Sequence, residues 1–129
     1  MTKGFNLQQG DLDALLKEYA DAALVHRTAS REGKHKIANR AYHRISTVMR
    51  ELRERGPHAL SALLRLLEDE RIEVRGWAAA HALEFAPDRA VHVLECIASG
   101  PASLEELSAK MVLQQWRHAG SIEGGGSPP

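Results

Sequence analysis

The amino-acid sequence predicts an all-α fold built from antiparallel helix pairs. The apolar residues are dominated by Leu, Ala, Val and Ile, with only two each of Trp, Tyr and Phe, a composition that favours helices over sheet. Apolar residues recur at helical spacing, as in Leu60, Leu63 and Leu67. From Pro57 onward the sequence also matches itself at an offset of 30 residues, with Pro57 aligned to Pro87. Such internal similarity is typical of stacked helix pairs.

The length of 129 residues fits one domain that can bury a core without disulfides or metals. We expect a flexible N-terminus at 1–10, a single helical domain at 11–118 and a disordered tail, which contains GGGSPP, at 119–129. The domain is expected to consist of about six helices in three antiparallel pairs. These hairpins are predicted at about 11–55, 57–85 and 87–118.

The first hairpin is predicted from two helical stripes and the turn between them. One helix is expected from Asp11, a good N-cap residue, to about Thr28. The polar run around Gly33 is the predicted turn, and a second helix is expected from about His35 to Arg55. The apolar stripe of that second helix comprises Ile37, Ala41, Ile45, Val48 and Leu52.

The stretch from Leu63 to Leu83 is the predicted centre of the domain. An acidic turn around Asp69 separates two helices, and the second of these is apolar on both sides. One face carries Val74, Trp77, Ala78, His81 and Phe85, and Ala79 and Leu83 lie opposite them. Because such a helix must be covered on both sides, we expect neighbouring helices around it and a buried Trp77.

The last helix is expected to run from about Ser103 to His118. Ser103 is followed three residues later by Glu106, which is the spacing of a capping box. The internal repeat aligns packing positions of the central helix with this one: Val74, Trp77 and His81 match Leu104, Leu107 and Met111. We therefore expect these three residues to pack as their counterparts do.

The central stretch resembles a HEAT or armadillo-type repeat. The resemblance is carried by a leucine-rich first helix, Asp69 in the turn, and the pairs Val74-Arg75, Ala78-Ala79 and Ala82-Leu83. The wider run VRGWAAAHALEFAP, followed by SAKMVLQQW, is similar to a small bacterial family of HEAT-like domains of unknown function, over about Asp11 to Trp116. The resemblance implies a right-handed α–α superhelix in which Asp69 and Arg75 link the turns of neighbouring repeats. Its structural residues would be Asp69, Val74, Arg75, Trp77, Ala78, Ala79 and Leu83. These motifs specify packing and bring no activity with them.

Charge is balanced overall but segregated along the chain. Counting Lys and Arg minus Asp and Glu, residues 1–25 give 2 − 4 = −2, residues 26–55 give 9 − 3 = +6, and residues 56–129 give 6 − 10 = −4. The second helix is therefore the best candidate for a binding face, since Lys36, Arg40, His43, Thr47 and Arg50 lie away from its apolar stripe. Arg27, Arg31 and Lys34 cluster just before it. Such a face suits phosphates or an acidic protein; the alternative is a solvated face that offsets the acidic turns.

Catalytic and metal-binding patterns are not evident in the sequence. The seven histidines form no HExxH and no HxH motif. His81, like His26, lies on an apolar stripe, where we expect a core or rim histidine, with ligand binding as the alternative. Cys96 is predicted to be a buried, inert thiol. We therefore expect no enzyme activity, no cofactor and no metal.

The sequence favours a non-catalytic module that binds another macromolecule, in the first place a protein, in the groove of a short helical stack. Arg75 and His81 are candidate residues of that groove, and a homodimer fits the short stack. One alternative is a nucleic-acid-binding or HEAT-like DNA-glycosylase-type protein that uses the basic second helix. Another is a HEAT-like enzyme acting on small molecules. With no secretory signal or membrane span in the sequence, we expect a cytoplasmic protein.

Overall fold

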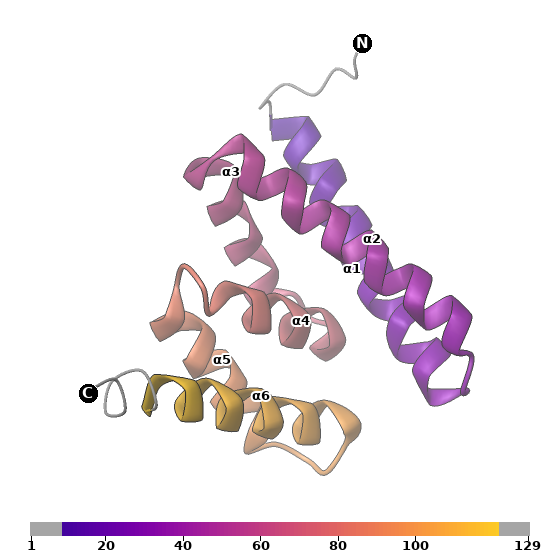
Figure 1. Cartoon of the computed structure of the whole chain (residues 1–129), viewed down its shortest axis with the longest axis vertical. Coiled ribbons are helices and arrows are strands. Elements are labelled where there is room, and N and C mark those ends of the chain that lie inside the picture. The colour runs from indigo at the N-terminus through magenta and orange to yellow at the C-terminus, as the bar shows by residue number, and fades with distance from the viewer. Residues whose placement is uncertain (1–8, 122–129) are drawn as a thin grey trace.

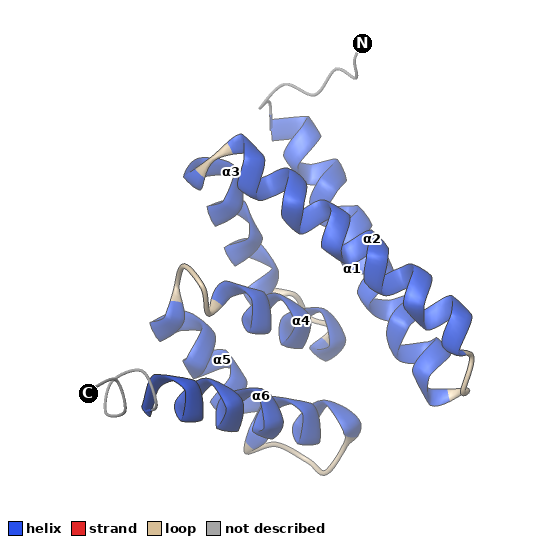
Figure 2. Ribbon diagram, in the orientation of Figure 1, coloured by secondary structure: helices blue, strands red, loops and turns tan. Residues whose placement is uncertain are grey.

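The computed structural model describes residues 9–121 of the chain, and that part consists of helices, turns and short loops without a strand (Figures 1 and 2). The six α-helices are joined by short turns, and a 3₁₀ helix, η1, follows the third. In chain order the elements are α1 (Gln9–Arg31), α2 (His35–Arg55), α3 (Pro57–Ser61), η1 (Ala62–Glu68), α4 (Ile72–Ala82), α5 (Pro87–Ala98) and α6 (Leu104–Ser121). The predicted all-α class is confirmed, and the right-handed superhelix stays a prediction.

Helices α1 and α2 form a long antiparallel hairpin (Figure 1). Its turn is shorter than expected, because α1 continues to Arg31 instead of ending near Thr28. The polar side chains there do not stop the helix, since they face solvent while Ala29 is buried. Gly33 then reverses the chain with a positive φ of 73°, which glycine adopts without strain. At the other end, α1 begins at Gln9, so Asp11 lies inside the helix and is not its N-cap.

The segment between the hairpin and the central helix is not one regular α-helix. After Ser61, α3 tightens into η1, and a 3₁₀ helix has about three residues per turn. That period aligns Leu63 with Leu66, and both are buried together with Leu67, whereas Leu60 of the predicted stripe is only partly buried. The 3₁₀ period therefore adds Leu66 to the inward set that the α-helical period predicts.

Helix α4 lies at the centre of the fold and packs against α1, η1, α5 and α6, as the apolar pattern predicts (Figure 1). Val74, Ala78, Ala79 and Ala82 are buried on it, and their small side chains let the neighbouring helices approach closely. Trp77 differs from the prediction, because it is only partly buried and packs against the core from its edge.

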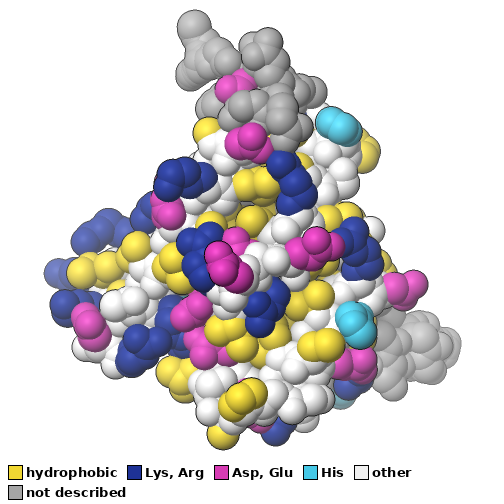
Figure 3. Space-filling view, turned by 180° about the vertical axis from the view of Figure 1, so that it is seen from behind, with side chains coloured by type: hydrophobic (Ala, Val, Ile, Leu, Met, Phe, Trp, Pro, Cys, Tyr) yellow, Lys and Arg dark blue, Asp and Glu magenta, His cyan; other side chains and the backbone are white. Residues whose placement is uncertain are grey.

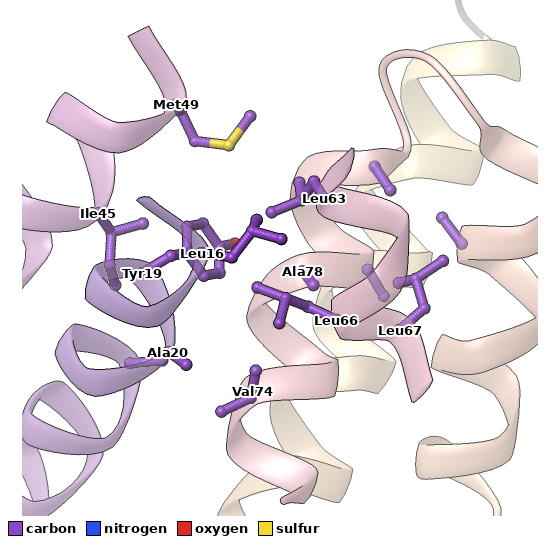
Figure 4. Packing of buried hydrophobic residues seen from close by; sticks show 14 of the residues in the cluster. Leu16, Tyr19, Ala20, Ile45, Met49, Leu63, Leu66, Leu67, Val74 and Ala78 are labelled. Carbon is purple, nitrogen blue, oxygen red and sulfur yellow. The ribbon is translucent and has the colours of Figure 1, made fainter. Parts of the chain in front are cut away.

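The core joins the α1–α2 hairpin to the central helices. Tyr19, Ile45 and Met49 of the hairpin face Leu63 and the start of α4 across one continuous apolar cluster (Figure 4). The predicted α2 stripe is buried at Ala41, Ile45, Val48 and Leu52, but Ile37 is 37% exposed. Ile37 lies in the first turn of α2, on the seam between α1 and α2 that no other described helix covers.

The turn before α4 is held by its own polar groups. Arg75 Nη1 donates to the Asp69 carbonyl oxygen at 2.8 Å and to that of Glu70 at 3.1 Å. The Asp69 carboxylate accepts from the backbone N–H of Arg71 at 2.8 Å and from its guanidinium, whose hydrogen bond holds the pKa of Asp69 below its ordinary value. These hydrogen bonds lie within one turn, whereas the resemblance implied a link between the turns of neighbouring repeats.

The last helix differs from its counterpart in the repeat. Ser103 Oγ accepts the backbone N–H of Glu106 at 3.0 Å, so the predicted cap forms. However, Leu104 is 48% exposed, and Leu107 and Met111 are each 52% exposed. No described helix covers this face of α6, because α6 is the last element of the stack. Of the predicted tail at 119–129, residues up to Ser121 belong to α6, and the rest, like most of the predicted N-terminal segment, lies outside the described residues.

Candidate functional site

The outward side of the α1–α2 hairpin carries the basic strip, which we define as Lys36, Arg40, His43, Thr47 and Arg50. All five side chains are exposed, and they succeed one another at spacings of three or four residues, so they share one face of α2. Lys36, Arg40 and Arg50 form no ion pair within the described part of the chain. Figure 3 shows Lys and Arg side chains gathered at the edge of the molecule where the hairpin lies.

A groove runs beside the basic strip, along the seam between α1 and α2. Its volume is about 580 Å³, and we call it the α1–α2 groove. The apolar side chains that line it are Leu15, Val25, Ile37, Ala41 and Val48. The polar side chains that line it are Glu18, Arg40, His43, Arg44, Thr47 and Glu51. The strip and the groove together form one surface with an apolar floor and a basic rim.

Ion pairs within the hairpin decide which cations of this surface are free. Arg44 donates to Glu18 through Nε at 2.6 Å and through Nη2 at 3.0 Å, and this bidentate contact lowers the pKa of Glu18. Glu51 accepts from Arg55 at 2.8 Å. Both carboxylates of the groove are therefore paired inside the hairpin. The unpaired positive charge of the surface comes from Lys36 and Arg40 of the strip, and from Arg50 beyond the groove.

The sequence predicts that three further cations, Arg27, Arg31 and Lys34, extend the strip at its N-terminal end. The structure does not place all three beside it. Arg31 is exposed at the end of α1, and Lys34 pairs with Glu32 at 3.0 Å in the turn. Arg27 lies on a different side of α1, where its Nε donates to the carboxylate of Glu105 in α6. The structure therefore separates Arg27 from the basic strip.

Arg27 instead borders a second cavity, of about 230 Å³, which we call the α4 cavity. It lies between four helices and is lined by His26, Arg27, Glu73, Gly76, Trp77, Ala80, Leu94, Glu105, Ser108, Ala109 and Val112. The His26 and Trp77 rings meet edge to face, with centroids 5.1 Å apart and planes at 81°. Burial, together with the neighbouring Arg27 charge, lowers the pKa of His26, so its imidazole is neutral at pH 7.

The two residues predicted for a concave groove have structural roles. Arg75 is bound to the turn carbonyls of Asp69 and Glu70 described above. His81 Nδ1 lies 2.6 Å from the hydroxyl of Tyr19, which is fully buried. Burial, followed by the charge of Arg53, lowers the pKa of His81 to about 4. His81 is thus neutral at pH 7 and shares this hydrogen bond with the tyrosine hydroxyl.

The predicted buried thiol is wrong, because Cys96 is exposed on α5. Successive residues of an α-helix differ by about 100°, and its neighbour Ile97 takes the inward position. The Cys96 Sγ lies 3.8 Å from Nε2 of His92, one turn earlier on the same exposed side. In the described residues, no three His, Cys, Asp or Glu side chains are placed to share a metal ion.

Comparison with known families assigns the chain to a family, and the description of that family names no activity. A family model described as "Domain of unknown function (DUF2019)" matches residues 13–116. The chain belongs to this family. The DUF2019 match includes the whole basic strip and every residue that lines the two cavities.

The DUF2019 chain is also similar to a solved structure, the protein RPA1889 from Rhodopseudomonas palustris CGA009. The similarity has a TM-score of 0.77 at 25% sequence identity and covers 98% of this chain and 99% of that chain. No curated protein matches the chain significantly. None of the described helices is long and apolar enough to cross a membrane.

Sequence reasoning found the basic strip of this DUF2019 chain but missed the two cavities. The groove was missed because Ile37 was assigned to the core, although it lies on the α1–α2 seam, which no other described helix covers. The α4 cavity brings together helices that are far apart in the sequence. Its one available signal was Gly76, a glycine in the interior of a predicted helix.

Proposed function

We propose that this protein is a non-catalytic module that binds an acidic, amphipathic helix of a partner protein in the α1–α2 groove. The observation that carries the proposal is a groove with an apolar floor whose α2 edge holds the unpaired Arg40, with Lys36 and Arg50 on the same face of α2 beyond the groove lining. Either feature alone would fit an ordinary surface. Together they match the two faces of one kind of ligand, a helix with apolar residues on one side and carboxylates beside them.

The shape of the groove supports a helical ligand. Two antiparallel helices leave a seam into which the side chains of a third helix can pack. The groove residues on α2 extend from Ile37 to Glu51, which at 1.5 Å per residue is about 21 Å. A partner helix of about four turns would fill that length.

The charge of the strip supports an acidic ligand. Lys36, Arg40 and Arg50 project from the same face of α2 as His43. A helix that carries Asp or Glu along one edge would meet these cations one after another while its apolar edge covers Val25 and Ile37. Electrostatic complementarity of this kind sets orientation and speeds association.

Nucleic acid is the second candidate ligand, since phosphates would meet the same cations. Two observations make it less favourable than a protein helix. The one Tyr, Trp or Phe ring on α2, Tyr42, has its centroid 5.9 Å from that of His43 in the strip and 6.3 Å from that of Trp77, so the strip has a single such ring beside it for base stacking. Residues 56–129 also carry 6 − 10 = −4 charges, which repel a long polyanion.

A designed peptide tests the proposal by fluorescence polarisation. The probe is a helical peptide of Leu and Glu whose leucines line one edge, and its controls are the same peptide with Lys for Glu and a short DNA duplex. The matched variants are Lys36→Gln/Arg40→Gln/Arg50→Gln and, away from the groove, Lys17→Gln/Arg65→Gln/Arg89→Gln. Both variants remove the same charge, and exposed ion pairs such as those of the control set contribute little to stability.

We expect the acidic peptide to bind, with affinity that falls as salt rises. The groove variant should lose about tenfold in affinity, since three charge contacts of a few tenths to one kcal/mol each are removed. The control variant should stay within about twofold of wild type, because long-range charge alone is screened. Tighter binding of DNA than of the peptide would favour the second candidate. Equal losses in both variants, or no binding of the acidic peptide, would overturn the proposal.

A further inference from the structure

The α4 cavity is a second feature that the proposed helix-binding surface does not use. It lies on the side of α1 that carries His26 and Arg27, and its other walls come from α4, α5 and α6. Its volume of about 230 Å³ can be compared with apolar cavities of roughly 150 Å³ that bind benzene. There is space for a small ring compound.

Gly76 keeps the middle of this cavity open. It lies in the interior of α4, where glycine stabilises a helix less than alanine does. Its backbone φ is not positive. A Cβ atom built on Gly76 would meet only Ile97 Cδ1, at 4.0 Å, which is an ordinary contact. Neither backbone conformation nor close packing therefore requires glycine here, and the missing side chain serves to leave room in the cavity.

The walls of the cavity disfavour an anionic ligand. The one guanidinium at its edge, Arg27, is paired with Glu105, and each of these side chains is only 15% exposed. The other carboxylate of the wall, Glu73, forms no ion pair within the described residues. An anion would therefore give up its hydration without finding a free cation, and Glu73 would repel it. The aromatic faces of Trp77 and His26 offer stacking or edge contacts to a ring. The hydroxyl of Ser108 offers one hydrogen-bonding group.

From these features we propose that the α4 cavity is a binding site for a small aromatic compound without negative charge, between benzene and indole in size, with no more than one polar group. Gly76 and Ala80 give the space, and Trp77 and His26 give the aromatic contact. The Arg27–Glu105 pair and the carboxylate of Glu73 exclude anions. This site is separate from the α1–α2 groove, so each of the two proposals can fail without the other.

The test is an amide NMR titration with indole as the probe. Two charged relatives serve as comparators: indole acetate, an anion, and tryptamine, a cation. We expect saturable shifts for the amides of His26, Gly76 and Ser108 with indole and with tryptamine, and at least about tenfold weaker binding of indole acetate because of its desolvation cost and its repulsion by Glu73. Benzene should compete with indole for the same amides.

Two cavity variants and one control make the test specific. Ala80→Leu puts three carbon atoms into the cavity and should abolish the indole shifts. Gly76→Ala adds a single methyl group to a helix that tolerates it and should weaken binding severalfold, which keeps the test valid if Ala80→Leu fails to fold. The control Ala14→Leu adds the same atoms as Ala80→Leu at an exposed position of α1 and should change nothing. Shifts that do not saturate, that persist in both cavity variants, or that are matched by indole acetate would overturn the proposal.

Discussion

At the scale of single residues, Trp77 is where aromatic packing converges. Its ring contacts His26, Tyr42 and His81, with centroid distances of 5.1 to 6.3 Å, although the side chain is only partly buried. Truncation of a fully buried aromatic costs about 3–5 kcal/mol. For this half-buried ring we expect Trp77→Ala to lower the free energy of unfolding by about 2–3 kcal/mol and Trp77→Phe by less, as measured by urea denaturation. A loss below about 0.5 kcal/mol for Trp77→Ala would show that the ring is a surface residue.

His81 makes stability depend on pH. Its pKa is about 4 in the folded protein, against about 6.5 in an unfolded chain, so the unfolded state binds the proton first as pH falls. The stabilisation is complete above about pH 6.5 and decreases towards pH 4, with a loss of about 2 kcal/mol by pH 5. His26, whose pKa is also lowered, acts in the same direction.

The variant His81→Asn isolates this effect. Asparagine has no titrating group, and its side-chain oxygen can still accept the hydrogen bond from Tyr19. We expect urea titrations between pH 7.5 and pH 5 to show about 2 kcal/mol less loss for the variant than for wild type, because the depressed histidine pKa is the cause. Equal pH dependence in the two proteins would contradict a neutral, buried His81.

At the scale of helices, we expect Gly76 to make α4 less stable than an alanine at the same position would. Gly76→Ala should raise the free energy of unfolding by about 0.5–1 kcal/mol, since alanine loses less backbone entropy and no atom lies closer than 4.0 Å to the new methyl group. Thermal unfolding followed by circular dichroism measures this change. A lower melting temperature would mean that α5 and α6 pack against the glycine more tightly than the contact distance indicates.

Helical periodicity predicted which segments are helices, but it did not predict which faces would be covered. Whether a face is covered depends on neighbours that a periodic pattern does not name. Leu107 has the same spacing and chemistry as a core residue and is exposed only because no described helix follows α6. Ile37 is exposed because it lies on the α1–α2 seam, which no other described helix covers. The shift from α3 to η1 was missed for a related reason, since a run of leucines fits both periods over one or two turns.

At the scale of the whole molecule, the Arg27–Glu105 pair ties the first helix to the last. The two residues are 78 positions apart, and each side chain is only 15% exposed. Glu105→Gln would leave the guanidinium without its counter-ion in a largely buried position. We expect a loss of about 1–3 kcal/mol in the free energy of unfolding.

The control for this prediction is Glu95→Gln, which breaks the exposed pair of Glu95 with Arg117, where the side chains are 51% and 56% exposed. Solvent screens such a pair, so its loss should cost less than about 1 kcal/mol. Equal destabilisation by the two substitutions would contradict a special role for the contact between α1 and α6.

The candidate surface could be predicted from the sequence only in part. The charges of Lys36, Arg40 and Arg50 follow from one helical wheel, because all three lie on the same element. Their position beside a groove depends on how α1 packs against α2. Arg27 lies apart from them because it pairs with Glu105, which is far along the chain. Local patterns describe one helix at a time, whereas a groove and a long-range ion pair are properties of the assembled fold.

A partner helix bound in the α1–α2 groove would perturb the backbone amides along that groove. Mapping these amides by NMR tests the proposed binding site directly. Titration of the labelled protein with the acidic Leu/Glu peptide should shift the amides of Val25, Ile37, Ala41 and Val48, which line the groove. The amides of Gly76 and Ser108 in the α4 cavity should stay unchanged. Perturbations confined to other faces, or spread evenly over the surface, would contradict binding of a partner helix in the α1–α2 groove.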